Sequence, residues 1–218
     1  MATITAAQVQ ELRQITGAGM VECKKALTEC EGDMEKAKDL LRKKGLATAS
    51  KKSGRIAAEG QVHAYIHGGG RVGVLLEVNI ETDFAARTED FKELVHEIAL
   101  HICASSPQYV TRDEIPPQVI EREKEIYAEQ LRLEGKPEKA WEKIMEGKVK
   151  KFFSENCLMD QPYAFENKIT ITDMVNNVTA KIGEKISVRR FVRWELGEGL
   201  EKRVYDLAKE VAAEMGPK

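Results

Sequence analysis

The sequence has little of what marks secreted, metal-binding or membrane-spanning proteins. Its 218 residues include four cysteines and no Cys-x-x-Cys pair, which argues against a disulfide scaffold and against the commonest zinc and redox motifs. Cys23 and Cys30 lie on one expected helix, about 10 Å apart along its axis, which is too far for a disulfide. No apolar run approaches the roughly 20 residues of a membrane span, and residues 1–14 lack the basic and apolar regions of a secretory signal. We therefore expect reduced thiols in a cytoplasmic protein that does not contact a membrane.

An excess of one charge is also missing. The chain has 34 basic and 36 acidic residues and a net charge of -2, so no overall field draws it to nucleic acid or anionic lipid. Its 42% apolar and 32% charged residues are typical of a globular protein with one sizeable domain and a small appendage. One local exception runs from Arg42 to Arg55, with six basic residues and no acidic one. This stretch is more typical of a solvated linker or helix end, and a phosphate-binding segment is the alternative.

Residues 1–45 are expected to form three short helices. Thr5 followed by Gln8 is a capping box for the first helix. Glycines interrupt the apolar pattern at 17–19 and at 32, and Gly45 is a suitable C-cap for the third helix. Residues 46–60, which combine small, polar and basic side chains, are expected to tether this module to a second domain.

From residue 61 the apolar period changes to two, which predicts strands. Two strands flank a turn at Gly68–Gly70 and form a hairpin with one buried face, and a third strand covers 186–194. Trp141 and Trp194 are both expected in the core. The residues expected to share buried faces are Val62, Ala64, Ile66, Val72, Val74, Leu76, Val78 and Ile80 on the hairpin, and Ile186, Val188, Val192 and Trp194 on the third strand, where Arg190 is a polar exception.

Further segments repeat apolar residues at three and four positions, which predicts amphipathic helices. They cover 91–102, 117–133, 138–155, 171–182 and 200–215. The second and third of these are joined by a short loop at 134–137 and are expected to pack antiparallel. The expected class is α+β: a small antiparallel sheet packed with helices, behind a helical N-terminal module.

The residue types that carry catalysis are present but poorly placed. His63 and His67 lie on one expected strand, about 13 Å apart, so they cannot share a metal ion. His96 and His101 lie on one helix but roughly 140° apart around it. The triple glycine at 68–70 lacks the lysine and serine or threonine of a phosphate loop. These patterns indicate a binding protein with no metal or cofactor, and they disfavour a metal- or thiol-dependent enzyme.

One short segment does not fit a plain surface loop. Residues 81–87, Glu-Thr-Asp-Phe-Ala-Ala-Arg, follow the second hairpin strand and precede a helix. Thr82 and Asp83 can cap a turn there through their side-chain oxygens. The spacing by itself favours Phe84 packing into its own core. The alternative is an exposed aromatic residue on a rigid elbow, as in an anchor that enters a partner.

The chain resembles the elongation factor Ts family, the nucleotide exchange factors of the GTPase elongation factor Tu. Four ordered stretches carry the resemblance and together span nearly the whole chain. They are Leu12-Arg13 through Thr16–Met20 to Cys23–Leu27; Glu77–Asn79 leading into Thr82-Asp83-Phe84; His101 with Ala104-Ser105 and Pro107; and Arg193–Gly199.

The resemblance implies a domain order that agrees with the periodicity. It assigns residues 1–45 to a ubiquitin-associated-like helical domain, 46–60 to a linker, 61–115 to the core hairpin and helix, and 116–155 to a protruding antiparallel coiled coil. The rest of the core is 156–197, and 198–218 is a C-terminal helical module. Only one hairpin-plus-helix unit is visible, as in short family members, some of which dimerise, so a homodimer is possible.

The resemblance also implies a mechanism. In the family the Thr-Asp-Phe segment contacts the GTPase domain and its phenylalanine inserts between two helices, which disturbs the magnesium and phosphate sites so that GDP leaves. Carried over by motif, Phe84 is the wedge, and Asp83 beside it positions the loop and engages the partner. Thr82 and Ala85 belong to the same partner-binding segment, and Ala85 replaces the more usual valine. Ala85 should therefore tune affinity more than mechanism.

Secondary contacts are implied for Gly19, Met20 and Lys24 in the N-terminal module and for the C-terminal helix. His101 matches a family position near the interface, but its place beside an apolar stripe equally favours plain packing.

Exchange breaks no covalent bond, so no enzyme chemistry is expected. The rival interpretation is an RNA- or ribosome-associated protein that uses Arg42–Arg55; the net charge of -2 and the lack of stacking aromatics argue against it.

Overall fold

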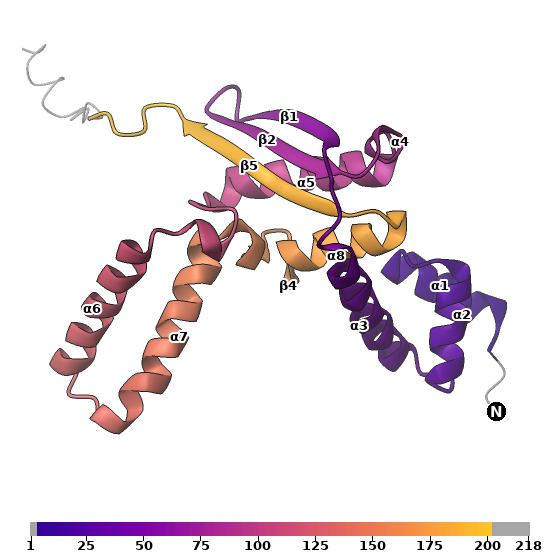
Figure 1. The fold of residues 1–218 in the computed structure, drawn as a ribbon, viewed down its shortest axis with the longest axis horizontal. Coiled ribbons are helices and arrows are strands. Elements are labelled where there is room, and N and C mark those ends of the chain that lie inside the picture. Colours follow the sequence, from indigo (N-terminus) through magenta and orange to yellow (C-terminus); the bar gives the residue numbers. More distant parts are fainter. Residues whose placement is uncertain (1–3, 202–218) are drawn as a thin grey trace, which may run out of the picture.

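The computed structural model describes residues 4–201 and has an N-terminal helical module, a central sheet with helices, and a projecting helical hairpin (Figure 1). The N-terminal module contains α1 (Ala6–Thr16), α2 (Met20–Glu29) and α3 (Met34–Lys52). Helix α1 begins with the expected capping box between Thr5 and Gln8 and ends at Gly17, which adopts φ 66°. The three helices enclose a small core of their own around Leu12, Cys23 and Leu27.

Helix α3 differs from the expectation in length. It was expected to end before Gly45, with a tether over 46–60, but it continues to Lys52 and packs against α8 (Ile171–Ile182). Gly45 lies inside the helix and faces α8, where a side chain added at Gly45 would lie 3.7 Å from Ala180. The expected helix end at Gly45 is therefore wrong, because tertiary packing outweighs the weak helix propensity of one glycine.

The sheet contains β1 (Glu59–His67), β2 (Val72–Ile80) and β5 (Ile186–Glu195) in the order β1-β2-β5, with both pairs antiparallel. Strand β2 has the expected buried face, Val74, Leu76, Val78 and Ile80. On β1 the buried face was predicted wrongly. Because Val62 pairs with Glu77 and His63 with Leu76, it is His63 and Tyr65 that face the helices, while Val62, Ala64 and Ile66 lie on the open face.

A bulge changes the faces of β5. Val188 pairs with Val78, but Glu77 pairs with Arg190, so Arg189 is an extra residue and the alternation reverses after it. Ile186, Val188 and Phe191 therefore lie on the helix side, and Val192 and Trp194 lie on the open face. Trp194 is 64% exposed, so the expectation that it belongs to the core is wrong for this chain.

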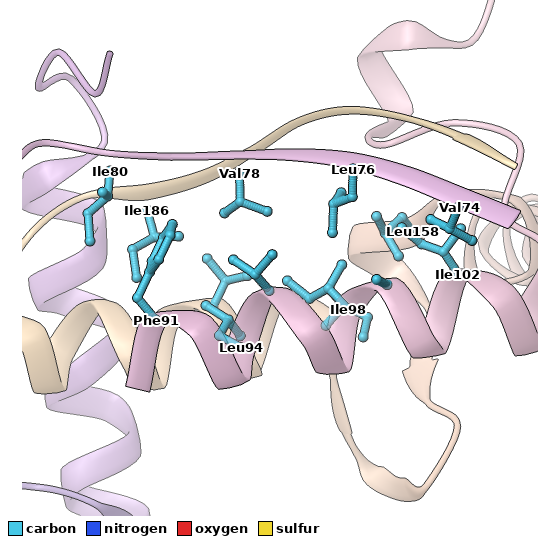
Figure 2. Close-up of a cluster of buried hydrophobic side chains, with 14 of the residues drawn as sticks. Val74, Leu76, Val78, Ile80, Phe91, Leu94, Ile98, Ile102, Leu158 and Ile186 are labelled. Atoms are coloured by element: carbon cyan, nitrogen blue, oxygen red, sulfur yellow. The ribbon is translucent and has the colours of Figure 1, made fainter. Parts of the chain in front are cut away.

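Helix α5 (Glu89–Ser105) covers the inner face of the sheet and supplies the second half of the core (Figure 2). Phe91, Leu94, Ile98 and Ile102 point toward the apolar residues of β2, as their three-and-four spacing predicts. Leu158 and buried residues of α8 belong to the same apolar cluster. The expected α+β class is confirmed.

The helical hairpin consists of α6 (Pro117–Leu133) and α7 (Glu138–Asn156), which lie side by side and project from the core (Figure 1). Pro117 begins α6 at its first turn and Gly135 adopts φ 65° in the connecting loop. Leu131 is fully buried between the helices, and Lys148 lies 5.2 Å from the Tyr127 ring centroid. The Trp141 indole stays partly exposed and donates to the Lys136 carbonyl oxygen at 2.8 Å.

Short elements complete the core: α4 (Asp83–Ala86), η1 (Arg112–Glu114), η2 (Leu158–Asp160), and a two-stranded sheet of β3 (Pro162–Tyr163) and β4 (Glu166–Thr170). Helix α8 begins with a capping box between Thr170 and Asp173, as expected. Most of the predicted C-terminal helix falls outside the described residues. Across residues 4–201, no helix combines the length and the apolar character that crossing a bilayer requires.

Candidate partner-binding site

The elbow between β2 and α5 contains a single helical turn, α4, with one threonine cap at the start of α4 and another at the start of α5. The Thr82 hydroxyl accepts a hydrogen bond from the Ala85 amide at 3.3 Å, which begins α4. Thr88 then caps α5 by accepting from the Phe91 amide at 3.4 Å. Two threonine caps six residues apart therefore fix the direction of the chain between the sheet and the helix.

Phe84 lies on the outside of this turn. Its side chain is 79% exposed, whereas the neighbouring Ala85 is only 6% exposed and belongs to the main core cluster. The preference for Phe84 as a core residue, drawn from spacing, is therefore wrong. The reason is that adjacent residues on a helix point in different directions, and Ala85 takes the inward one.

Asp83 pairs with Arg87 of the same turn, with 2.9 Å between carboxylate and guanidinium atoms. Both side chains are substantially exposed, so this ion pair adds little to stability. It leaves a carboxylate and a guanidinium beside Phe84 at the surface. Of the expected turn-capping pair, Thr82 makes the cap and Asp83 instead makes this ion pair.

The elbow is tied to a turn more than 100 residues away in the chain, a contact that the sequence analysis did not identify. Glu184 accepts hydrogen bonds from the Thr82 amide at 3.0 Å and from the Thr82 hydroxyl at 2.8 Å. Glu81 accepts from the Lys185 amide at 2.6 Å. Nothing in the local pattern around residues 184–185 signals these contacts, because they depend on how β5 is placed beside β2.

The secondary site residues lie on a different part of the molecule from α4 (Figure 1). Gly19 is the N-cap of α2, and a side chain added there would meet none of residues 4–201 within 4 Å. Met20 is 51% exposed and Val21 is 64% exposed. Lys24 is exposed on the same helix and, with Val21, lines a shallow surface depression. The structure thus brings Gly19, Met20 and Lys24 together, but apart from Phe84.

His101 is fully buried. Its Nδ1 atom accepts from the Ala164 amide at 3.2 Å, so its Nε2–H donates to the Gln161 side-chain oxygen at 2.8 Å. Burial lowers the pKa of His101, although the hydrogen bond to Gln161 opposes that shift. The placement agrees with the packing alternative: His101 holds the β3–β4 hairpin against α5.

The basic stretch 42–55 is engaged with the core. Arg42 forms an ion pair with Asp173 at 3.1 Å, Lys52 donates to the Gly183 carbonyl oxygen, and Arg55 contacts Glu81 at 3.3 Å. Lys44 also pairs with Glu29 of α2 at 2.6 Å, so at least four of the six basic side chains have protein partners. This arrangement does not favour the stretch as a nucleic-acid-binding surface.

Histidines from β1 and α5 meet edge to face, with the His63 and His96 ring centroids 5.7 Å apart. Within residues 4–201, no three or more side chains of the His, Cys, Asp and Glu types gather closely enough to hold a metal ion. All four cysteines are free thiols. Burial raises the pKa of Cys157 to about 11, which keeps this thiol protonated and unreactive at neutral pH.

Comparisons with known proteins agree on one family. Residues 34–198 match the family model described as Elongation factor TS. Proteins named elongation factor Ts are similar over nearly their whole length. The one from Desulforamulus reducens is 57% identical over 99% of both chains. That from Moorella thermoacetica is 59% identical over 90% of this chain and 97% of its own, and that from Geobacter sulfurreducens is 58% identical over 98% and 99%.

Proposed function

The chain belongs to the elongation factor Ts family, and from this membership we propose that it catalyses exchange of GDP for GTP on the translation GTPase elongation factor Tu. The family assignment makes it a translation elongation factor. The observation that supports the exchange mechanism is Phe84, which is 79% exposed on a turn that lies between the threonine caps of α4 and α5. The place of action is the cytoplasm, where translation elongation occurs.

In this proposal Phe84 inserts between two helices of the GTPase domain. The insertion disturbs the partner's magnesium site and then its phosphate loop, so GDP leaves and GTP can bind. An exposed aromatic side chain on a rigid base suits this step, because little conformational freedom is lost when it binds. Asp83 and Arg87, which flank Phe84 at the surface, would contact polar groups at the rim.

The energetics require more than one contact. By linkage, a factor that weakens GDP binding has its own binding weakened equally by GDP. Burying one phenylalanine side chain stabilises a complex by roughly 1.5–3 kcal/mol, about one to two decades in an equilibrium constant. We therefore assign a second grip to Gly19, Met20 and Lys24 of the N-terminal module and to the C-terminal segment 198–218. His101 is fully buried, so we assign it a packing role without contact with the partner.

The test is release of a fluorescent GDP analogue from elongation factor Tu. The parent chain should accelerate release, and Phe84→Ala should lower that acceleration by about 10- to 100-fold, as expected for one buried phenylalanine. Phe165→Ala is the matched control, because Phe165 is also an exposed phenylalanine, 60% exposed, on the distant β3–β4 turn. This control should retain the parent's rate.

Each other outcome is informative. Equal acceleration by the parent and Phe84→Ala would keep the exchange function but refute the wedge. No acceleration by a folded parent chain would refute the proposed function itself. An equal loss in Phe165→Ala would show that the effect is not specific to the α4 turn.

We also propose that two copies of this chain pair through the open face of the sheet. This surface carries apolar side chains from all three strands: Val62, Ile66, Leu75, Val192 and Trp194, which are 62%, 64%, 42%, 42% and 64% exposed. A contiguous apolar sheet face is unusual on a monomer. A two-fold axis would place the same face of each copy against the other, so that both patches are buried at once.

A further inference from the structure

The turn between α8 and β5 holds the elbow at Thr82 through side-chain and backbone hydrogen bonds. Both Glu184 carboxylate oxygens contact Thr82, one at the amide and the other at the hydroxyl. Glu184 is half-buried, and its two contacts are charge-assisted. The same Thr82 hydroxyl accepts from the Ala85 amide, so one side chain links Glu184 to the first turn of α4.

A second link runs in the opposite direction across the same junction. Glu81, the residue before Thr82, accepts from the Lys185 amide, and this hydrogen bond is the main cause that lowers the pKa of Glu81. Arg55 contacts the Glu81 carboxylate at 3.3 Å, and the Lys185 ammonium group donates to the Arg55 carbonyl oxygen at 2.8 Å. Each of the two segments, 81–82 and 184–185, therefore supplies one glutamate whose carboxylate accepts a hydrogen bond from a backbone amide of the other segment.

We propose that Glu184 is a positioning residue for nucleotide exchange: it holds Thr82, and through Thr82 the α4 turn, so that Phe84 is presented to the partner in one orientation. This inference rests on the exchange function proposed above. Glu184 itself need not touch the partner.

The physical reason is the position of Thr82 at the point where β2 ends and α4 begins. Thr82 is extended, with φ −129° and ψ 153°, and it lies outside both elements, so neither the sheet nor the helix holds its amide. Glu184 supplies the missing acceptor. Without it the amide would bond to water and the loop would regain conformational freedom. Phe84 would then have to be ordered as it inserts into the complex already held by the second grip, which slows the exchange step and not the initial binding.

The first experiment measures the loop in the free protein. Residue-resolved amide hydrogen exchange should become about tenfold faster at Thr82 and Ala85 in Glu184→Ala, while the amides of the α5 core stay as protected as in the parent. Glu146→Ala is the matched control, because Glu146 is an exposed glutamate on α7, away from the elbow. Unchanged exchange at Thr82 and Ala85 would overturn the inference, whatever the function of the chain.

The second experiment measures GDP release from elongation factor Tu with the same variants. Glu184→Ala should lower the maximal release rate about tenfold and leave the half-saturating concentration within about twofold of the parent. Glu184→Gln keeps one carbonyl acceptor for the Thr82 amide and should recover most of the rate. Glu146→Ala should match the parent. A shift in half-saturation alone would overturn the inference, because it would indicate a lost contact with the partner.

A double variant separates this inference from the proposed wedge. If Glu184 acts by placing Phe84, the variant carrying both Phe84→Ala and Glu184→Ala should release GDP no more slowly than Phe84→Ala alone. A further tenfold loss in the double variant would overturn the positioning role. Failure of Phe84→Ala to reduce release would instead refute the wedge, and the hydrogen-exchange result would still report whether Glu184 holds the loop.

Discussion

At the scale of single residues, burial fixes the protonation of two histidines. His101 is fully buried, and the His63 Nε2 atom is buried with no hydrogen-bond partner among the residues that the structure describes. Burial lowers the pKa of both side chains below the ordinary value of 6.5, and His96 lowers that of His63 further, while a hydrogen bond to Gln161 opposes the shift at His101. Both imidazoles are therefore neutral in the folded chain at neutral pH.

We predict that stability falls on acidification below pH 6.5. A lowered folded-state pKa means that the unfolded chain binds more protons in this range, so the free energy of unfolding decreases as pH falls, by at most about 1.4 kcal/mol per pH unit for each histidine. Urea unfolding at pH 7.5, 6.5 and 5.5 measures the slope. His63→Gln and His101→Gln should each flatten it. A stability that is constant across this range would contradict the prediction.

At the scale of elements, two glycines show how the same residue can be essential in a strand and replaceable in a helix. Gly60 in β1 has φ +136°, and a side chain there would lie 2.1 Å from the Val78 carbonyl oxygen and 2.8 Å from the Asn79 Cα atom. Gly147 lies inside α7 with nothing within 4 Å of an added side chain. Gly60 is required because β1 and β2 approach closely there, whereas the surroundings of Gly147 leave space for a side chain.

The two glycines give a matched pair of substitutions. Gly60→Ala should lower the free energy of unfolding by more than about 2 kcal/mol, because both the backbone angle and the neighbouring strand oppose a side chain. Gly147→Ala should raise the stability of the helical hairpin by up to about 1 kcal/mol, the difference in helix propensity. Chemical denaturation followed by circular dichroism measures both. A neutral Gly60→Ala would show that β1 can move away from β2 at this point.

At the scale of the whole molecule, one side of the sheet is used for the core and the other is left open. Helix α5 covers the inner face (Figure 1), while the outer face exposes apolar side chains that include Leu75 and Trp194. The N-terminal module and the helical hairpin both extend away from the open face (Figure 1). A second copy could therefore approach the sheet without meeting either of them.

We predict that the chain is a dimer at micromolar concentration and that Trp194→Glu makes it a monomer. A charge within the apolar interface would be buried without a partner, which costs several kcal/mol. Light scattering coupled to size exclusion measures the mass against 24.5 kDa for one chain. Leu133→Glu, at an apolar position on α6 that is 78% exposed, against 64% for Trp194, is the control and should leave the mass unchanged. A monomeric parent would contradict the proposed pairing.

Local chemistry was sufficient to predict much of the fold. The capping boxes at Thr5 and Thr170, the proline at the start of α6, and the apolar stripes of α5 and β2 act over a few residues, so the sequence determines them directly. The wedge segment was found by its motif. The Thr82 cap could be expected from the same local rules, because a threonine hydroxyl reaches only the next few amides.

Tertiary structure decided what depends on neighbours distant in the chain. The bulge at Arg189 reversed the faces of β5, and pairing with β2 turned Val62 and Ile66 outward, because register is set by the partner strand. Packing against α8 carried α3 past Gly45. The direction of Phe84 depends on Ala85 taking the inward position in the core, and the hold of Glu184 on Thr82 joins residues 102 positions apart. Such contacts leave no local pattern, since they arise only when the strands are placed side by side.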